Sequence, residues 1–324
     1  MKKPTMIYRS LLRDAWLVTW QRKSLWVFGI FAGLLFSGGV IDVLLSGFHR
    51  ITQAGSLLQN LMDQTFIGYE YLSQFLLYLA HVNPTQLKFV LLLIVLVTLG
   101  LIIAGVISQA ALIHASGSAP AHPHHIRRTV LPHVWDVLLL NILVKTLSAI
   151  FITLVTLPIL LFGLVGNQAY SIVFIHFLLY IPAVLCIHIL FMLTLISLIE
   201  THDSLLHALH SAWKIFQKHW FSALEFSLIL FILVLSATLI LSASISLISF
   251  AIGPAIKQLF LVSPFLVTWF TVLFLAMCFA AVFLSFGGMV VTFQYSAWRM
   301  FYQRATHRIH GRRVFAKLFR WLFA

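Results

Sequence analysis

The sequence is poor in charged residues, and this deficit decides its broad class. Asp, Glu, Lys and Arg make up 9% of its 324 residues, against about 25% in a soluble globular domain. Hydrophobic residues make up 61%, and the mean hydropathy is +1.02. So little charge excludes a soluble domain and a disordered chain. We therefore expect an integral membrane protein.

Cysteine and catalytic signatures are also scarce. The two cysteines, Cys186 and Cys278, lie inside long apolar runs, which excludes a disulfide-stabilised secreted scaffold. The chain contains no HExxH, GxSxG, P-loop or Rossmann glycine pattern, and its 8 acidic residues are dispersed. We therefore predict that the protein is not an enzyme and has no catalytic residues, no metal site and no cofactor.

Six apolar stretches are long enough to cross the membrane, because a hydrocarbon core of about 30 Å needs about 20 residues of helix. They predict an all-α integral membrane protein with a six-helix transmembrane domain over residues 24–294. The short connection around Asn167 predicts that the third and fourth spans form an antiparallel hairpin. The six stretches are 24–45, 87–113, 137–165, 171–199, 221–248 and 259–291.

Basic residues are concentrated in alternate connections between these stretches. Of the 21 Lys and Arg residues, 17 lie in 1–23, 114–136, 200–220 and 295–324. The positive-inside rule predicts that these segments and both termini are cytoplasmic. The first span follows a basic segment and has no cleavage site, which indicates a retained signal-anchor. With no glycosylation acceptor present, we expect a bacterial inner membrane, and no nucleic acid partner despite the net charge of +13.

Amphipathic segments border the spans on this predicted cytoplasmic side. In the segment 1–23, Leu11 and Ala15 share one helical face, so we expect a helix along the leaflet that then turns into the first span. The tail 295–324 ends in a basic amphipathic helix. We expect both to bind membrane lipids, above all anionic headgroups, or a protein partner. The predicted interface residues are Trp16, Trp20, Trp213, Trp298, Arg313, Lys317 and Arg320.

A short pattern recurs on the same side. The dipeptide Ala-Trp occurs at 15–16, 212–213 and 297–298, each time near basic residues. The recurrence indicates either an internal duplication of a helix-plus-span unit or convergence, since any interfacial helix favours Trp with Lys or Arg.

The first of these segments carries a family resemblance. Its pattern LLRDAWLVTWQRKSLWVFG, at residues 11–29, resembles bacterial polytopic membrane proteins described as similar to the membrane domain of glycerophosphoryl diester phosphodiesterases. The likeness covers about the first 30 residues and, loosely, residues 204–226. It implies a helical membrane bundle. It does not imply phosphodiesterase activity, because the catalytic barrel of those enzymes needs far more soluble sequence.

Polar residues within the spans are candidates for a substrate pathway, because charge in hydrocarbon is costly and often functional. Lys145 and Glu225 are predicted at similar depth in the third and fifth spans, which permits an ion pair between them. Snorkelling and a proton or substrate pathway are the alternatives. Thr238, Ser242 and Ser246 recur at four-residue spacing in the fifth span, which indicates either helix packing or a polar pathway.

Other small or polar residues in the spans indicate packing. Gly29, Gly33 and Ser37 form a small-residue stripe suited to close helix contact. His176 and His188 in the fourth span point in different directions, which suits packing better than one metal site.

The histidines outside the spans do not form a recognisable metal site. His122, His124 and His125 crowd one loop, and His207 and His210 share a helical face near Asp203. Neither group supplies a complete ligand set. Ordinary loop composition is the preferred interpretation, with metal binding or pH-dependent association with the leaflet as alternatives.

The predicted function is that of a non-enzymatic polytopic membrane protein that organises lipids or other membrane proteins. The alternative is a transporter or permease subunit for a small or lipid-like solute, using Lys145, Glu225 and the hydroxyls of the fifth span. A membrane-embedded enzyme ranks third. A water-filled cavity reached by Glu225 would favour transport, whereas a packed core with a lipid-facing groove would favour the first function.

Overall fold

The computed structural model describes residues 7–35, 84–117, 130–162, 169–262 and 265–307. All regular secondary structure within these residues is helical, which confirms the predicted all-α class. The elements are α1 (Ile7–Gln21), α2 (Leu25–Leu35), α6 (Pro84–Gly117), the 3-10 helix η1 (Leu131–His133), α8 (Val134–Phe162), α9 (Ala169–Thr201), α10 (Leu205–Val262) and α11 (Phe265–His307).

Five stretches of these helices are long and apolar enough to cross a membrane. They overlap the second to sixth predicted spans, with different bounds. The described part of the predicted first span is α2, with 11 residues, and residues 36–45 lie outside the described residues. The chain therefore has the character of a multi-pass helical membrane protein. The five stretches are Leu87–Gly117, Leu131–Phe151, Pro182–Thr201, Leu205–Pro254 and Trp269–Thr306.

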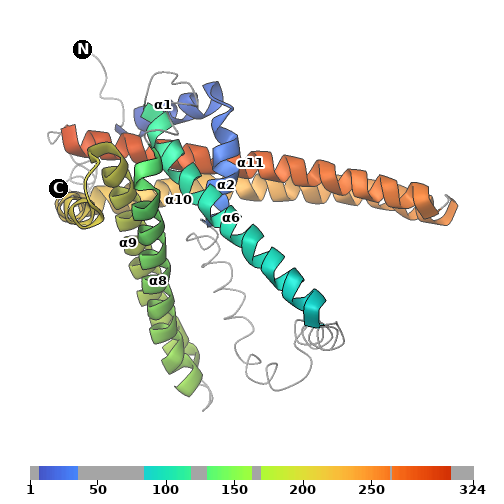
Figure 1. Ribbon diagram of the computed structural model, residues 1–324, viewed down its shortest axis with the longest axis horizontal. Coiled ribbons are helices and arrows are strands. Elements are labelled where there is room, and N and C mark those ends of the chain that lie inside the picture. Colours follow the sequence, from blue (N-terminus) through green and yellow to red (C-terminus); the bar gives the residue numbers. More distant parts are fainter. Residues whose placement is uncertain (1–6, 36–83, 118–129, 163–168, 263–264, 308–324) are drawn as a thin grey trace, which may run out of the picture.

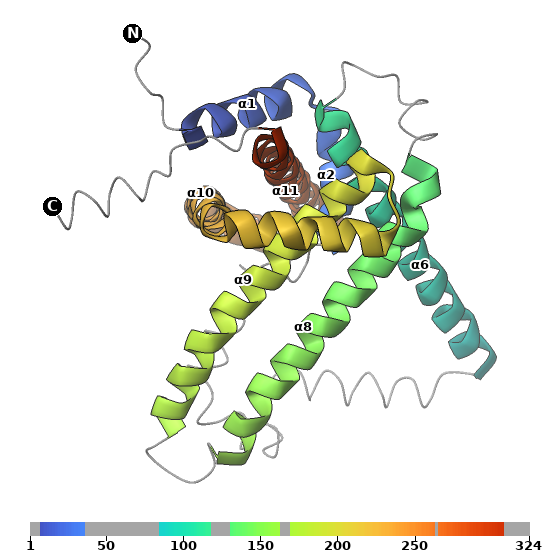
Figure 2. The ribbon, with the colours of Figure 1, turned by 90° about the vertical axis from the view of Figure 1, so that its left-hand side faces the viewer.

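The helices meet at one end and diverge from it, as Figures 1 and 2 show from two directions. We call the shared end the hub. Its buried apolar side chains form one connected core. The rest of each long helix is an arm: α6 forms one, α8 with α9 a second, and α10 with α11 a third. The hub comprises residues 7–35, 106–117, 130–144, 185–230 and 291–307.

One sequence prediction about topology is confirmed by this arrangement. Helices α8 and α9 run side by side as an antiparallel pair, as the short connection between them predicted. The described parts of the segments predicted to share one side of the membrane also lie together in the hub: α1, the residues around η1, the turn from α9 to α10, and the end of α11. Their side of the membrane stays a prediction.

Helix α10 combines an interfacial segment with a span. Its backbone is non-helical at His219 (φ −126°, ψ 20°), next to the predicted start of the fifth span. Beyond this kink the helix continues to Val262, past residue 248, where the span was predicted to end. The apolar sequence continues through 249–252, and Pro254 does not end the helix. Proline is tolerated inside membrane helices because other groups satisfy the freed backbone.

Helix α2 packs between α6 and α11 through small residues. A Cβ atom added to Gly29 would overlap the carbonyl oxygen of Gly288, and one added to Gly288 would overlap the carbonyl oxygen of Trp26. The hydroxyl of Thr292 lies 3.1 Å from the carbonyl oxygen of Leu25 at the same crossing. The small-residue stripe therefore makes close helix contact at Gly29, as predicted, whereas Ser37 lies outside the described residues.

The three Ala-Trp pairs share one structural property. Ala15, Ala212 and Ala297 are each 0% exposed in the core of the hub. Their tryptophans differ, because Trp16 and Trp213 are exposed whereas Trp298 is buried. What the three copies have in common is therefore a close helix contact at alanine. Duplication remains a prediction.

Candidate functional site

The hub contains a charged cluster where α6, α9 and α11 end. The Arg299 Nε atom donates to Glu200 Oε1 at 2.7 Å, and the Gln303 amide donates to the same oxygen at 2.9 Å. Arg22 donates to the carbonyl oxygen of Ala115 near the end of α6, and the Arg299 guanidinium lies against Gly117. Cations at a helix C-terminus interact favourably with the helix dipole. The cluster therefore ties three helix ends together.

Helix α1 is docked onto the hub by polar contacts. The Tyr8 hydroxyl donates to Glu225 Oε2 at 3.0 Å, which joins α1 to α10. Arg304 of α11 donates to Ser10 at 2.9 Å and to Asp14 at 3.4 Å. Burial of the ring, and secondly the negative charge of Glu225, raise the pKa of the Tyr8 phenol above its ordinary value. The phenol is therefore held in its protonated, donating form.

The apolar face of α1 has a different role from the one predicted. Leu11 and Ala15 are buried in the core, and α1 packs against α11. The sequence predicted a helix lying along the leaflet, but these two side chains contact protein. The reason is that α11 offers an apolar partner surface, which amphipathicity alone does not reveal.

Aromatic side chains surround the bend between α1 and α2. Trp16 stacks on Trp20 and Trp20 contacts Trp26, in each case with ring centroids 5.8 Å apart. The ammonium of Lys23 lies 5.5 Å from the centre of the Trp20 ring, a cation–π contact. The indole N–H of Trp26 donates to the carbonyl oxygen of Thr19 at 3.0 Å and so fixes the bend. An exposed aromatic and cationic surface results.

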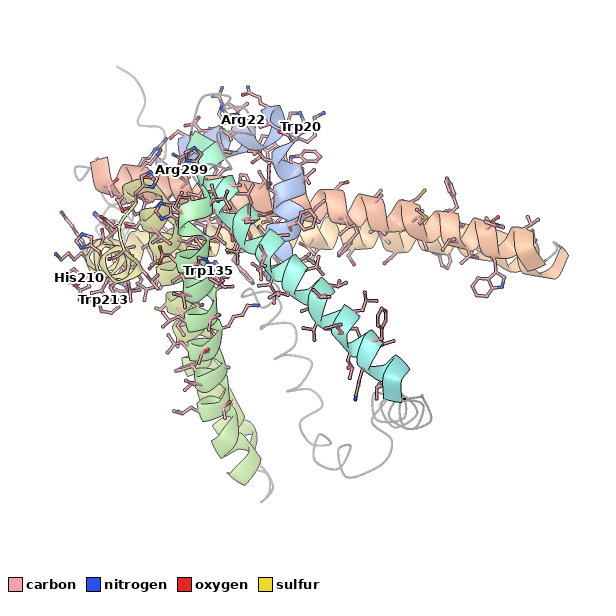
Figure 3. The ribbon with its side chains drawn as sticks, in the orientation of Figure 1. Trp20, Arg22, Trp135, His210, Trp213 and Arg299 are labelled. Atoms are coloured by element: carbon pink, nitrogen blue, oxygen red, sulfur yellow. The ribbon has the colours of Figure 1, made fainter. Side chains whose placement is uncertain are left out.

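The predicted interface residues fall into three groups. Trp16, Trp20 and Trp213 are exposed on the hub, as an interfacial role requires. Trp298 is 2% exposed and packs edge-on against Phe226 and Phe301, so it is a core residue and not an interfacial one. Figure 3 shows the exposed Trp20 and Trp213 at the hub, with Arg22 and Arg299. The basic residues predicted in the tail, Arg313, Lys317 and Arg320, lie outside the described residues.

The substrate-pathway candidates do not form a common site. Lys145 is exposed on the arm of α8 and forms no ion pair with Glu225, whose carboxylate accepts from Tyr8 instead. The predicted ion pair is therefore wrong. Thr238 donates to the carbonyl oxygen of Val234 within its own helix, and Ser242 and Ser246 are exposed on the arm of α10. No hydrogen bond joins any two of these candidates.

Two histidines form a contact that the sequence did not reveal. Nε2 of His133 lies 2.9 Å from Nδ1 of His202, and the rings stack. His202 has φ = 56°, a left-handed conformation in the turn between α9 and α10. His207 lies 3.8 Å from Asp203 on the exposed start of α10. Within the described ranges, no three His, Cys, Asp or Glu side chains are grouped to hold a metal ion.

A buried amide pair links α6 and α8. Asn141 Nδ2 donates to Gln109 Oε1 at 2.8 Å and to the carbonyl oxygen of Val137 at 2.8 Å. Tyr295 of α11 is also buried, and its hydroxyl interacts with Gln109. The residues predicted from the sequence as candidates in the spans were mainly charged residues and histidines, so this amide pair was not among them. The signal that could have found this pair is the rarity of side-chain amides within apolar runs.

In comparisons with known proteins, no family model, curated protein or solved structure matches this chain. The resemblance of residues 11–29 to the membrane domain of glycerophosphoryl diester phosphodiesterases therefore stays a prediction.

Proposed function

We propose that the protein organises lipids or other membrane proteins in a bacterial inner membrane, without catalysis. In this proposal the hub lies at the cytoplasmic leaflet, both termini are cytoplasmic and six helices span the bilayer, with residues 24–45 as the first. Trp16, Trp20 and Trp213, together with the basic residues of the hub, face the anionic headgroups.

The exposed apolar surface of the arms is the observation that best supports this proposal. The arms leave long apolar surfaces uncovered, while the packed core is confined to the hub. In the most apolar stretches of α6, α10 and α11, 11%, 11% and 0% of the residues are buried. Apolar area on this scale requires lipid or the helices of other membrane proteins around it. Such surfaces suit a protein that binds the lipids or the helices of other membrane proteins around it.

The permease alternative has less support. A pathway needs polar groups that converge, whereas Lys145, Glu225 and the hydroxyls of α10 make separate contacts. Its test is solute flux into proteoliposomes, with Glu225→Gln as the control variant. Flux that Glu225→Gln abolishes would place the alternative first.

Photocrosslinking in membranes tests the proposed function. A photoreactive phenylalanine analogue replaces Phe250, which is 84% exposed on α10, or Phe270 on α11, and the buried Phe226 is the matched control. We expect adducts to lipid or to other proteins from the two arm positions and none from Phe226. Adducts formed only within the same chain would mean that the arms close on one another, and the proposal would fail.

Reporter fusions test the topology that the proposal requires. Fusions after residues 60 and 324 should report opposite sides of the membrane, with residue 324 in the cytoplasm. The same side for both would exclude six spans.

A further inference from the structure

Lys145 carries a charge in the middle of an apolar arm. It is exposed on α8, and no residue that the structure describes pairs with it. Its neighbours on the helix, Ile142, Leu143 and Leu147, are exposed apolar side chains. Charged residues within membrane spans almost always pair with another group. Among the described residues, Lys145 therefore lacks a partner that its position requires.

The depth of Lys145 separates it from the headgroups. Trp135, which is 72% exposed at the start of α8, suits the headgroup level. Lys145 lies ten residues further along, or about 15 Å at the helical rise, and so near the middle of a hydrocarbon core of about 30 Å. A phosphate at the headgroup level is too far for its ammonium. The partner has to carry its negative charge within the hydrocarbon.

Lys145 lies where two arms part. It is one helical turn beyond Asn141, whose amide contacts Gln109 of α6, so Lys145 is on the face of α8 that turns toward α6. Beyond this contact α6 and α8 diverge in both views (Figures 1 and 2). The diverging part of α6 exposes apolar side chains, including Val97 and Leu101. We call the exposed apolar faces of α6 and α8 on either side of this divergence, within residues 87–105 and 142–154, the fork.

The carboxylates described near the hub are not free to reach the fork. Glu225 accepts from Tyr8, Glu200 pairs with Arg299, and Asp14 pairs with Arg304. Asp203 lies beside His207 on the hub surface. Asp136 lies on α8 itself, nine residues before Lys145, which places it on the opposite face of the helix. The described part of this chain thus offers Lys145 no anion.

We propose that the fork docks a transmembrane helix of another membrane protein and that a carboxylate on this helix pairs with Lys145. The inference rests on the proposed function and specifies the chemistry of the partner. The apolar side chains of the fork suit an apolar helix, and Lys145 selects a helix that carries Asp or Glu at mid-membrane depth. A single buried charge pair of this kind gives specificity, because a helix without the acid leaves the lysine unpaired.

A synthetic probe tests the proposal without knowledge of the natural partner. The probe is a leucine-rich transmembrane peptide with one central Asp, and the matched peptide has Asn at that position. Energy transfer from labelled peptide to the labelled full-length protein reports association in phosphatidylcholine vesicles. We expect the Asp peptide to bind about tenfold more tightly than the Asn peptide. Equal binding of the two peptides would overturn the proposal.

Variants of the protein test whether Lys145 is responsible for the preference for the Asp peptide. Lys145→Met should abolish the preference for the Asp peptide, whereas Lys218→Met, which removes an exposed lysine on the hub segment of α10, should leave it unchanged. A preference that survives Lys145→Met would overturn the proposal. In a separate measurement, spin-labelled phosphatidylglycerol that is enriched around the wild type but not around Lys145→Met would show that a lipid is the partner, and this too would overturn it.

One further variant distinguishes a partner protein from this chain itself. Asp42 lies outside the described residues, in the predicted first span. If Asp42→Asn binds the Asp peptide and the wild type does not, Lys145 is already paired within its own chain and the proposal is wrong. Crosslinking from Phe250 and Phe270 probes the third arm, so it tests the proposed function independently of the fork.

Discussion

Gly29 of α2 and Gly288 of α11 bring two helix backbones into direct contact, although 258 residues separate them in the sequence. No side chain fits between the two helices at this crossing. The Thr292 hydroxyl, 2.7 Å from the carbonyl oxygen of Gly288, lies beside it. Small residues that allow close backbone approach are enriched where helices associate in lipid. This crossing therefore joins the first described helix pair to the last described helix.

Gly288→Ala should destabilise the protein. The added methyl group would meet the carbonyl oxygen of Trp26, a backbone atom that cannot move by a rotamer change. We expect a loss of about 1–3 kcal/mol in the free energy of unfolding. The measurement is thermal unfolding in mild detergent. Gly287→Ala is the control, because a Cβ there meets nothing within 4 Å; equal effects of both substitutions would exclude the close crossing.

Arg299→Met should destabilise the hub far more than loss of a surface ion pair does. The side chains of Arg299 and Glu200 are 13% and 20% exposed, so the substitution leaves a largely buried carboxylate without its cation. We expect a cost of about 3 kcal/mol or more. Asp14→Asn breaks the more exposed pair with Arg304 and should cost less than about 1 kcal/mol. Chemical denaturation in detergent compares the two, and similar losses would contradict the burial of Arg299.

Tyr8 makes stability depend on alkaline pH. Since the pKa of the Tyr8 phenol is raised in the folded state, its contribution to stability is fully present below the ordinary pKa of about 10. The contribution is lost as the pH rises from about 10 toward the raised pKa. Unfolding measured between pH 8 and 11 should therefore show a steeper decline for the wild type than for Tyr8→Phe. Parallel curves would show that the phenol is not buried beside Glu225.

Gln109 and Asn141 should behave as one unit. Gln109→Leu removes one partner of a buried amide, which costs about 1–3 kcal/mol because a polar group loses its hydrogen bond. The double variant with Asn141→Leu should be more stable than the sum of the single losses predicts. A double-mutant cycle on thermal unfolding measures this coupling. Strictly additive losses would mean that the two amides do not interact.

Substitutions of Trp298 and Trp213 should have different effects, because Trp298 packs in the core and Trp213 lies on the surface. Trp298→Ala removes a buried ring from a cluster with Phe226 and Phe301 and should cost about 3–5 kcal/mol. Trp213→Ala, at an exposed ring, should change stability little and instead weaken binding to vesicles that contain anionic lipid. Unfolding and vesicle partitioning together check this contrast, which would fail if the two variants unfolded alike.

The fold class was predictable because apolar run length reports membrane spans directly. The arrangement of the hub was less so, since it depends on contacts between distant residues. Trp213 and Trp298 both follow an alanine and lie beside basic residues, so the sequence predicts the same environment for both. Trp298 is a core residue because it packs against Phe226 and Phe301. Glu225 could be recognised as needing a partner, but Tyr8 is 217 residues away and was not a candidate. Uncharged Gln109 and Asn141 gave too weak a signal.

The contact of α2 with α11 has a consequence for how the protein is made. Leu25 leaves the ribosome long before Thr292, which follows it by 267 positions, and all three arms lie between them in the sequence. The hub can therefore be completed only after α11 has entered the membrane. Until then the arms are inserted as independent helices and hairpins, and α1 and α2 have no α11 to pack on. Assembly proceeds from the membrane-inserted arms to the hub, and a chain truncated before Gly288 would be retained in the bilayer but never close its core.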